Sequence, residues 1–242
     1  MSQARERIAW AADLPLDQAL RLWPQLSPVV GVVKVGLSLF VEHGPAAVQA
    51  FRSQGAALFL DLKLHDIPNT VESAAAAAGM LGASLLTVHA GGGEEMLRAA
   101  VRGAARGAKS AGMSPPRLLA VTALTSLGDA EVGALGFGIS AAEMADRLAE
   151  LAVRSGVGGL VCSAREAPRL RARHPGLFLC TPGIRPAGAA VGDQVRVETP
   201  AAAISGGSNL LVVGRPLHGA ADPAAAARAL HDEVAAALGS GS

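Results

Sequence analysis

The sequence predicts an α/β fold, a (β/α)8 TIM barrel formed as a single domain. Two observations indicate this fold: eight short apolar runs recur along the chain, and each is followed by a stretch with helical periodicity. Strands that are apolar along most of their length are typical of a parallel sheet covered on both faces by crossover helices. A length of 242 residues suits one barrel of this kind, and no linker divides the chain.

The apolar runs predict strands at residues 8–12, 29–35, 57–62, 85–89, 118–122, 159–162, 178–181 and 210–213. Helical spacing predicts the intervening helices at residues 16–26, 45–54, 70–81, 94–109, 141–154, 164–173, 200–205 and 223–238. Capping signals support these bounds, as where Ser140 and Glu143 form a capping box. An open doubly wound sheet competes, but no Gly-x-Gly-x-x-Gly follows the first predicted strand. We expect the barrel to cover residues 1–238 and residues 239–242, Gly-Ser-Gly-Ser, to form a flexible tail.

Composition excludes several classes of protein. Hydrophobic residues make up 50% of the chain, which is enough for a large buried core. The 21 Lys and Arg residues nearly balance the 20 Asp and Glu residues, so we expect neither a nucleic-acid partner nor a polybasic membrane anchor. No apolar run reaches the roughly 18 residues of a membrane span, and the N-terminal apolar stretch is too short for a signal peptide. Two cysteines without metal-site spacing exclude a disulfide framework, and together these features predict a cytoplasmic protein.

Polar residues collect at the carboxyl ends of the predicted strands, the rim at which barrels of this fold carry their chemistry. Because residues two apart in a strand share a face, Asp61 and Lys63 are expected to point into the barrel together. Charges taken out of water cost several kcal/mol each unless they are paired, so this arrangement favours a functional site over a structural ion-pair network. The rim residues are Asp13, Lys34, Asp61, Lys63, Asp66, Gly214 and Arg215.

The segment DLKLHDIPNT at residues 61–70 closely resembles the signature of the orotidine 5′-phosphate decarboxylase family. Further motifs of this family follow in the same order, namely VKVG at 33–36, VHA at 88–90, TPGIRP at 181–186 and VVGRP at 212–216. The Asp-x-Lys-x-x-Asp part alone is shared with related sugar-phosphate barrels, whereas its combination with TPGIRP and GRP is specific. A small departure is AAD at 11–13, where the family more often has ALD. The resemblance implies a cofactor-free conversion of orotidine 5′-monophosphate to UMP and carbon dioxide in de novo pyrimidine biosynthesis.

The resemblance also implies a role for individual residues. Lys63 would stabilise and protonate the carbanion left at C6 of the substrate, and the charged network around it would be completed by Asp61, Asp66 and Lys34. The substrate-binding residues would be Asp13, Lys34, Thr70, Thr125, Arg185, Gln194, Gly214 and Arg215. In the family, Asp66 and Thr70 reach the site of the other subunit, which implies a homodimer with shared active sites. The long connection at residues 182–194 would close over the phosphate.

Two other interpretations remain open. A metal-dependent decarboxylase or aldolase of the same barrel group would act on a sugar phosphate, but no Glu occupies a predicted strand end and the fourth strand ends in His89, so no metal site is expected. A non-catalytic phosphate-binding barrel would need Arg215 but not a buried Lys63 between carboxylates. His65 and His89 are expected to be structural, and both cysteines are expected to be small buried apolar residues.

Overall fold

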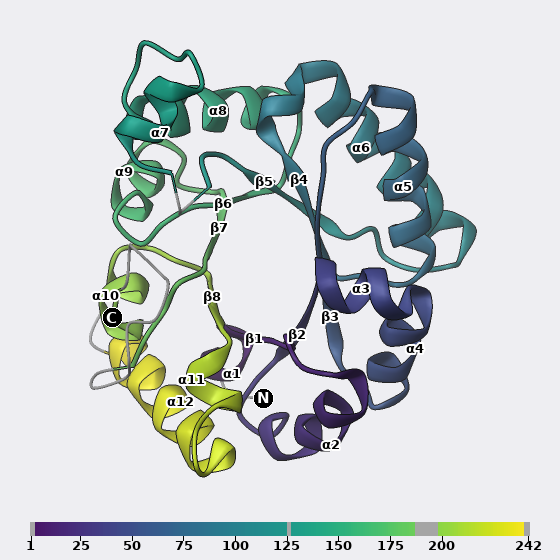
Figure 1. Ribbon diagram of the computed structural model, residues 1–242, viewed down its shortest axis with the longest axis vertical. Helices are drawn as coiled ribbons and strands as arrows, with labels where there is room; N and C mark the ends of the chain where they lie inside the picture. Colours follow the sequence, from purple (N-terminus) through teal and green to yellow (C-terminus); the bar gives the residue numbers. More distant parts are fainter. Residues whose placement is uncertain (1–2, 125–126, 187–197, 240–242) are drawn as a thin grey trace.

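Eight parallel strands close into a barrel in which each strand is hydrogen-bonded to the next and β8 to β1 (Figure 1). The structure is a computed structural model in which residues 3–124, 127–186 and 198–239 are described. The (β/α)8 fold predicted from the sequence is therefore confirmed. The strands are β1 (Ile8–Ala11), β2 (Val32–Gly36), β3 (Ala57–Leu64), β4 (Leu85–His89), β5 (Arg117–Val121), β6 (Gly159–Val161), β7 (Phe178–Thr181) and β8 (Leu210–Val213).

The helices form a ring around these strands (Figure 1). Eight of them correspond to the predicted helices: α2 (Leu16–Leu26), α4 (Pro45–Ser53), α5 (Pro68–Met80), α6 (Gly93–Ser110), α8 (Ala141–Arg154), α9 (Ala167–Arg173), α10 (Pro200–Ser205) and α12 (Pro223–Gly239). The last helix extends to Gly239, one residue into the segment expected to be a flexible tail. Residues 240–242 of that segment lie outside the described residues.

Two strand bounds differ from those predicted by more than one residue, each for a physical reason. Strand β2 begins three residues later, because the amides of Val29 and Val30 donate to the carbonyl of Leu26 at the end of α2. Strand β3 continues two residues further, to Leu64, because an irregularity in its pairing with β4 absorbs extra residues. Hydrophobic spacing alone does not reveal either hydrogen-bonding pattern.

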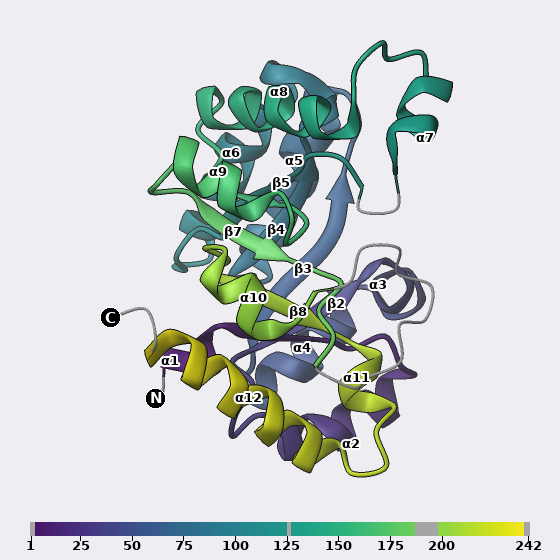
Figure 2. The same ribbon diagram turned by 90° about the vertical axis from the view of Figure 1, so that its left-hand side faces the viewer.

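Short helices that the sequence did not predict lie mostly around one end of the barrel. They are α1 (Gln3–Glu6), α3 (Leu37–His43), the 3-10 turn η1 (Ala90–Gly92), α7 (Asp129–Ala134) and α11 (Arg215–His218). All except α1 follow the carboxyl end of a strand, and Figure 2 shows α3, α7 and α11 on the side toward which β7 points. They are too short for helical periodicity to be visible in the sequence. They add structure at the mouth where the polar residues gather.

The core has two layers. The outer layer, between strands and helices, includes Trp10, whose ring stacks on Trp23 at 6.4 Å and meets Phe51 edge-on at 6.4 Å. Full burial of a side chain such as Phe51 contributes about 1.5 to 3 kcal/mol. The inner layer fills the barrel with Ala9, Ala11, Phe59, Leu85, Leu119, Cys180, Leu210 and Val212. These layers fix the strand ends, and therefore the side chains at the mouth.

Helices α5 and α6 approach one another backbone to backbone. A Cβ added at Gly103 would collide with the carbonyl oxygen of Glu72, and one added at Gly107 would collide with that of Ala76. Only glycine permits such an approach. The two helices follow β3 and β4, so their tight packing holds the strands that carry the charged segment in fixed register.

Candidate active site

A chain of alternating charges crosses the carboxyl ends of β1, β2 and β3. The Asp61 carboxylate lies at its centre, with Oδ1 2.8 Å from the Lys63 Nζ and Oδ2 3.4 Å from the Lys34 Nζ. The Lys34 Nζ also lies 3.6 Å from Oδ1 of Asp13. The side chains of Lys34 and Asp61 are only 10% and 13% exposed, so each depends on the other for charge compensation. The structure thus brings together four of the charged residues predicted for this rim, Asp13, Lys34, Asp61 and Lys63, but it does not bring Asp66 into the predicted network.

Lys63 reaches this network by an unusual backbone path. Leu60 pairs with Leu86 and Leu64 pairs with Val88, so four steps along β3 oppose two steps along β4. Lys63 lies in this bulge with φ at +48°, the only non-glycine residue with a positive φ among the described residues. Such a conformation costs about 1 to 3 kcal/mol for a residue with a Cβ. The regular alternation assumed from the sequence is therefore wrong here, although Lys63 and Asp61 do face the same cavity.

Thr87, which lies opposite the bulge, is not among the site residues predicted from the sequence. Its hydroxyl oxygen accepts a hydrogen bond of 2.9 Å from the backbone amide of Lys63. The same hydroxyl donates to Oδ1 of Asp61 at 2.9 Å. A strand threonine is usually a packing residue, so only the register between β3 and β4 could have revealed this contact.

Asp61 is ionised at neutral pH. Burial alone would raise the pKa of its carboxyl group, but the positive charges of Lys34 and Lys63 and the hydrogen bonds from Lys63 and Thr87 outweigh burial and leave that pKa below its usual value. The Asp61 carboxylate compensates the charge of the Lys63 ammonium at 2.8 Å. Such an ammonium can stabilise negative charge developing on a carbon and then supply a proton.

An inner cavity of about 200 Å³ opens beside this network. Its charged wall is formed by Lys34, Asp61 and Lys63. The rest of its lining is apolar, and consists of Phe59, Val121, Ala123, Leu124, Val161, Cys180, Pro182 and Val212. Cys180 is thus buried as predicted, but it also faces the cavity. One charged wall and several apolar walls suit a flat, partly apolar ring that carries a reacting anionic group.

An outer cavity of about 410 Å³ adjoins the inner one, since Lys34, Pro182 and Val212 line both. It is also lined by Ala11, Asp13, Gly183, Arg185, Gly214, Arg215 and His218. Arg185 is buried, and both its burial and the positive charge of Arg215 lower the pKa of its guanidinium. Two arginines of like charge around one hollow favour a doubly charged anion such as a phosphate group.

His218 is a second residue that the sequence analysis missed. The Trp10 Nε1 donates to its Nδ1 at 3.3 Å, and the carbonyl of Ala11 is a further hydrogen-bond partner. Burial lowers the pKa of this imidazole and the charge of Arg215 lowers it further, against the opposing effects of Asp13 and Ala11. His218 is therefore neutral at pH 7, and it fastens α11, which begins with Arg215, to β1.

Other predicted site residues do not join these cavities. Asp66 and Thr70 are exposed, and Oδ1 of Asp66 accepts a hydrogen bond of 2.6 Å from the Ile67 amide. Thr125 and Gln194 lie outside the described residues, as does most of the predicted closing segment at 182–194. His65 and His89 stack at 5.4 Å between ring centroids, beside the charged network.

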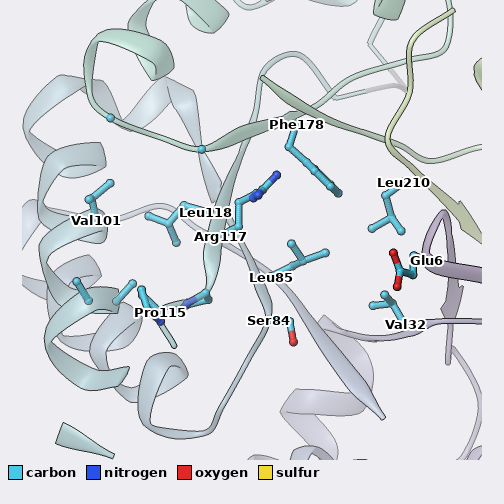
Figure 3. A pocket seen from close by; sticks show the side chains of 15 residues that line it. Glu6, Val32, Ser84, Leu85, Val101, Pro115, Arg117, Leu118, Phe178 and Leu210 are labelled. Atoms are coloured by element: carbon cyan, nitrogen blue, oxygen red, sulfur yellow. The ribbon is translucent and has the colours of Figure 1, made fainter. Parts of the chain in front are cut away.

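A larger cavity of about 640 Å³ lies at the opposite end of the barrel (Figure 3). Residues at the amino ends of strands line it, such as Val32, Leu85 and Arg117, whose guanidinium lies 4.6 Å above the Phe178 ring centroid. None of the predicted site residues borders it, and chemistry in this fold occurs at the carboxyl ends. Size alone is therefore a poor guide to the active site.

The described part of the chain lacks both a membrane-spanning helix and a metal-binding cluster. No helix there is sufficiently long and apolar to cross a membrane. Nor do three or more His, Cys, Asp or Glu side chains come together there in a group that could hold a metal ion.

Comparison with known proteins gives a consistent result. The model of the "Orotidine 5'-phosphate decarboxylase / HUMPS family" matches residues 6–230. An orotidine 5′-phosphate decarboxylase from Anaeromyxobacter sp. (strain K) is 54% identical over 93% of this chain and 96% of its own length. The enzyme of the same name from Thermobifida fusca is 50% identical over 94% of this chain and 95% of its own length. The crystal structure of orotidine 5′-phosphate decarboxylase from Lactobacillus acidophilus superposes with a TM-score of 0.83 at 38% identity, covering 95% of this chain and 99% of that one.

Proposed function

The chain belongs to the orotidine 5′-phosphate decarboxylase family and is an enzyme of that family, and on this premise we propose that it decarboxylates orotidine 5′-monophosphate to UMP in de novo pyrimidine biosynthesis. One observation carries the proposal: the Lys34–Asp61–Lys63 network borders an inner cavity that continues into a cavity with two arginines. A pyrimidine ring fits the first cavity, and a phosphate group fits the second.

The reaction requires a positive charge close to C6. When the bond between C6 and the carboxylate breaks, carbon dioxide leaves and the electron pair stays on C6, in the plane of the ring. No neighbouring carbonyl or cofactor delocalises this pair, so we assign its stabilisation to the Lys63 ammonium. A proton then passes from Lys63 Nζ to C6, and the amine regains a proton from water. Asp61 pairs with Lys63 through one carboxylate oxygen, and Lys34 compensates the second oxygen.

The parts of the substrate that do not react are assigned to the outer cavity. We assign the phosphate to Arg185 and Arg215, with Gly214 allowing close approach of the backbone. Lys34 lines both cavities and lies beside Asp13, a placement that supports contacts from both to the ribose. Thr125 and Gln194 remain predicted contacts to the pyrimidine and the phosphate. Phosphate binding energy would then hold the ring against the charged network.

We further propose that the enzyme is a homodimer, with Asp66 and Thr70 completing the partner's site. Both are exposed in the single chain, as a residue that serves another subunit would be. Ile67, next to Asp66 in the sequence, is an apolar residue that is 66% exposed, and Leu37 and Val41 in α3 are 51% and 81% exposed. Leu37 and Val41 share one face of α3, which packs beside β3. The two free, buried cysteines are compatible with the cytoplasmic location that we also propose.

The experiment that tests this function follows the change in ultraviolet absorbance as orotidine 5′-monophosphate is turned over. We expect the purified enzyme to release UMP and carbon dioxide, and to keep its rate after treatment with a strong metal chelator. Absence of turnover would contradict the proposal. Strict dependence on magnesium together with activity on a sugar phosphate would instead favour the metal-dependent members of this barrel group.

A further inference from the structure

The hydroxyl group of Thr87 is part of a closed set of hydrogen bonds around the proposed proton donor. It accepts from the Lys63 amide at 2.9 Å and donates to Asp61 Oδ1 at 2.9 Å, and this oxygen also accepts from the Lys63 Nζ at 2.8 Å. The backbone and the side chain of Lys63 are thus joined through two other residues. Thr87 has no exposed surface, so water cannot replace its hydroxyl group without rearrangement.

The bulge in β3 explains why a side chain is needed at this point. The register shift between Leu60 and Leu64 interrupts the regular ladder with β4, and within this bulge the Lys63 amide donates to the Thr87 side chain. A buried amide without a partner is costly, and the positive φ of Lys63 adds strain. The Thr87 oxygen supplies a buried acceptor for this amide. The bulge in β3 therefore depends on the Thr87 hydroxyl group as the acceptor for its Lys63 amide.

We propose that Thr87 is a positioning residue, whose hydroxyl group holds the Lys63 backbone in the bulge and orients the Asp61 carboxylate that binds the Lys63 ammonium. This inference rests on the proposed function, in which that ammonium meets C6. Thr87 does not line either cavity at the carboxyl mouth, so it acts through Lys63 and Asp61 rather than on the substrate. Removing the hydroxyl group should misplace the ammonium while leaving the phosphate and ribose contacts in place.

The test compares Thr87→Val, which keeps the shape but loses the hydroxyl group, with Thr87→Ser, which keeps the hydroxyl group. We expect Thr87→Val to lower kcat roughly 10- to 100-fold while KM changes less than about threefold, because a small displacement of a reacting group affects the transition state most. Thr87→Ser should stay within about fivefold of the wild-type kcat. Equal losses in both variants, a wild-type kcat in Thr87→Val, or a change confined to KM would each overturn the inference.

Thr181→Val is the matched control. Thr181 is equally buried, its hydroxyl group bonds to that of Ser208 at 2.7 Å, and neither residue lines either cavity. Losing this hydroxyl group should affect stability in a similar way but leave kcat unchanged. If kcat of Thr181→Val fell as far as that of Thr87→Val, the loss of activity would reflect a general loss of stability. That result would overturn the positioning role of Thr87.

A second measurement does not depend on activity. The chain contains three lysines, Lys34, Lys63 and Lys109, so ¹⁵N-lysine labelling resolves the Lys63 backbone amide by NMR. We expect this amide to exchange with solvent faster in Thr87→Val than in the wild type or Thr87→Ser, and an unchanged exchange rate would overturn the inference. If Thr87→Val does not fold, Thr87→Ala carries the same expectations. Absence of turnover by the wild-type protein would refute the proposed function. The exchange rate of the Lys63 amide would still show whether the Thr87 hydroxyl group holds the Lys63 backbone.

Discussion

Lys63 combines a strained backbone with a charged tip in a single residue. Its φ of +48° places it in the bulge, and Asp61 binds its ammonium at 2.8 Å. The strain and the desolvation of the pair both cost free energy, which is offset only by hydrogen bonds within the network. Such a costly arrangement is expected where the reaction requires the ammonium at a defined position, even at the expense of stability.

Replacing Lys63 with alanine should remove the proton donor without removing the binding site. We expect Lys63→Ala to lower turnover of orotidine 5′-monophosphate at least about 1,000-fold, since a positioned acid and its charge are both lost. The affinity for UMP, measured by calorimetry, should change far less, because Arg185 and Arg215 remain. A variant that turns over near the wild-type rate would exclude Lys63 as the donor.

The half-buried imidazoles of His89 and His218 predict how stability responds to pH. Burial lowers the pKa of His89, as do the nearby charges of His65 and Lys63, while Asp61 opposes them; burial also lowers the pKa of His218. The unfolded chain, with histidine pKa values near 6.5, therefore binds these protons more readily than the folded chain. The free energy of unfolding should fall as the pH decreases below about 6.5. The lowered pKa of Asp61 adds a second loss only at much lower pH.

Urea unfolding at pH 7.5 and pH 5.5 checks this prediction. We expect the wild type to be less stable at the lower pH, and His218→Asn to show a smaller decrease because one of the two groups is gone. The effect should be modest, since both rings are only partly buried. Identical decreases in the two proteins would show that His218 does not contribute.

At the scale of single elements, α5 and α6 determine how firmly β3 and β4 are held. These helices touch through glycines, and the Thr87 contact depends on the register of the two strands that precede them. Similarly, α11 carries Arg215 and is tied to β1 through His218 and Trp10. Elements outside the cavities thus determine the geometry within them.

The glycine contact gives a prediction about stability. A methyl group added at Gly107 would collide with the Ala76 carbonyl, so Gly107→Ala should destabilise the fold by about 1 to 3 kcal/mol. Gly133→Ala is the control, because Gly133 lies within α7 with open space around it, and the same change there should stabilise by about 0.4 to 1 kcal/mol. Chemical denaturation measures both variants. A stable Gly107→Ala would mean that the two helices can separate at little cost.

At the scale of the whole molecule, one barrel supplies two adjoining cavities while Asp66 and Thr70 face outward. The proposed homodimer gives these two residues a role, because the partner's cavities are then within their reach. A symmetric interface would place the same pair at both sites. Each chain would then hold a complete proton donor but an incomplete ribose site.

Mixing two inactive variants tests this arrangement. Lys63→Ala and Asp66→Ala should each be severely impaired alone, but after joint unfolding and refolding their mixture should recover up to about a quarter of wild-type activity. In a mixed dimer, one site would combine an intact Lys63 with an intact Asp66. No recovery, in a mixture shown to contain mixed dimers, would mean that the sites are not shared.

The sequence by itself determined the barrel, its strand order and the charged segment at its mouth. Apolar periodicity and residues two apart on one strand are local properties, so they can be recognised in the sequence. Only the tertiary structure decided that Lys63 lies in a bulge, that Thr87 accepts its amide, and that His218 joins Arg215 at the outer cavity. These contacts depend on the register between strands that are distant in the sequence, and local patterns do not encode such long-range relations.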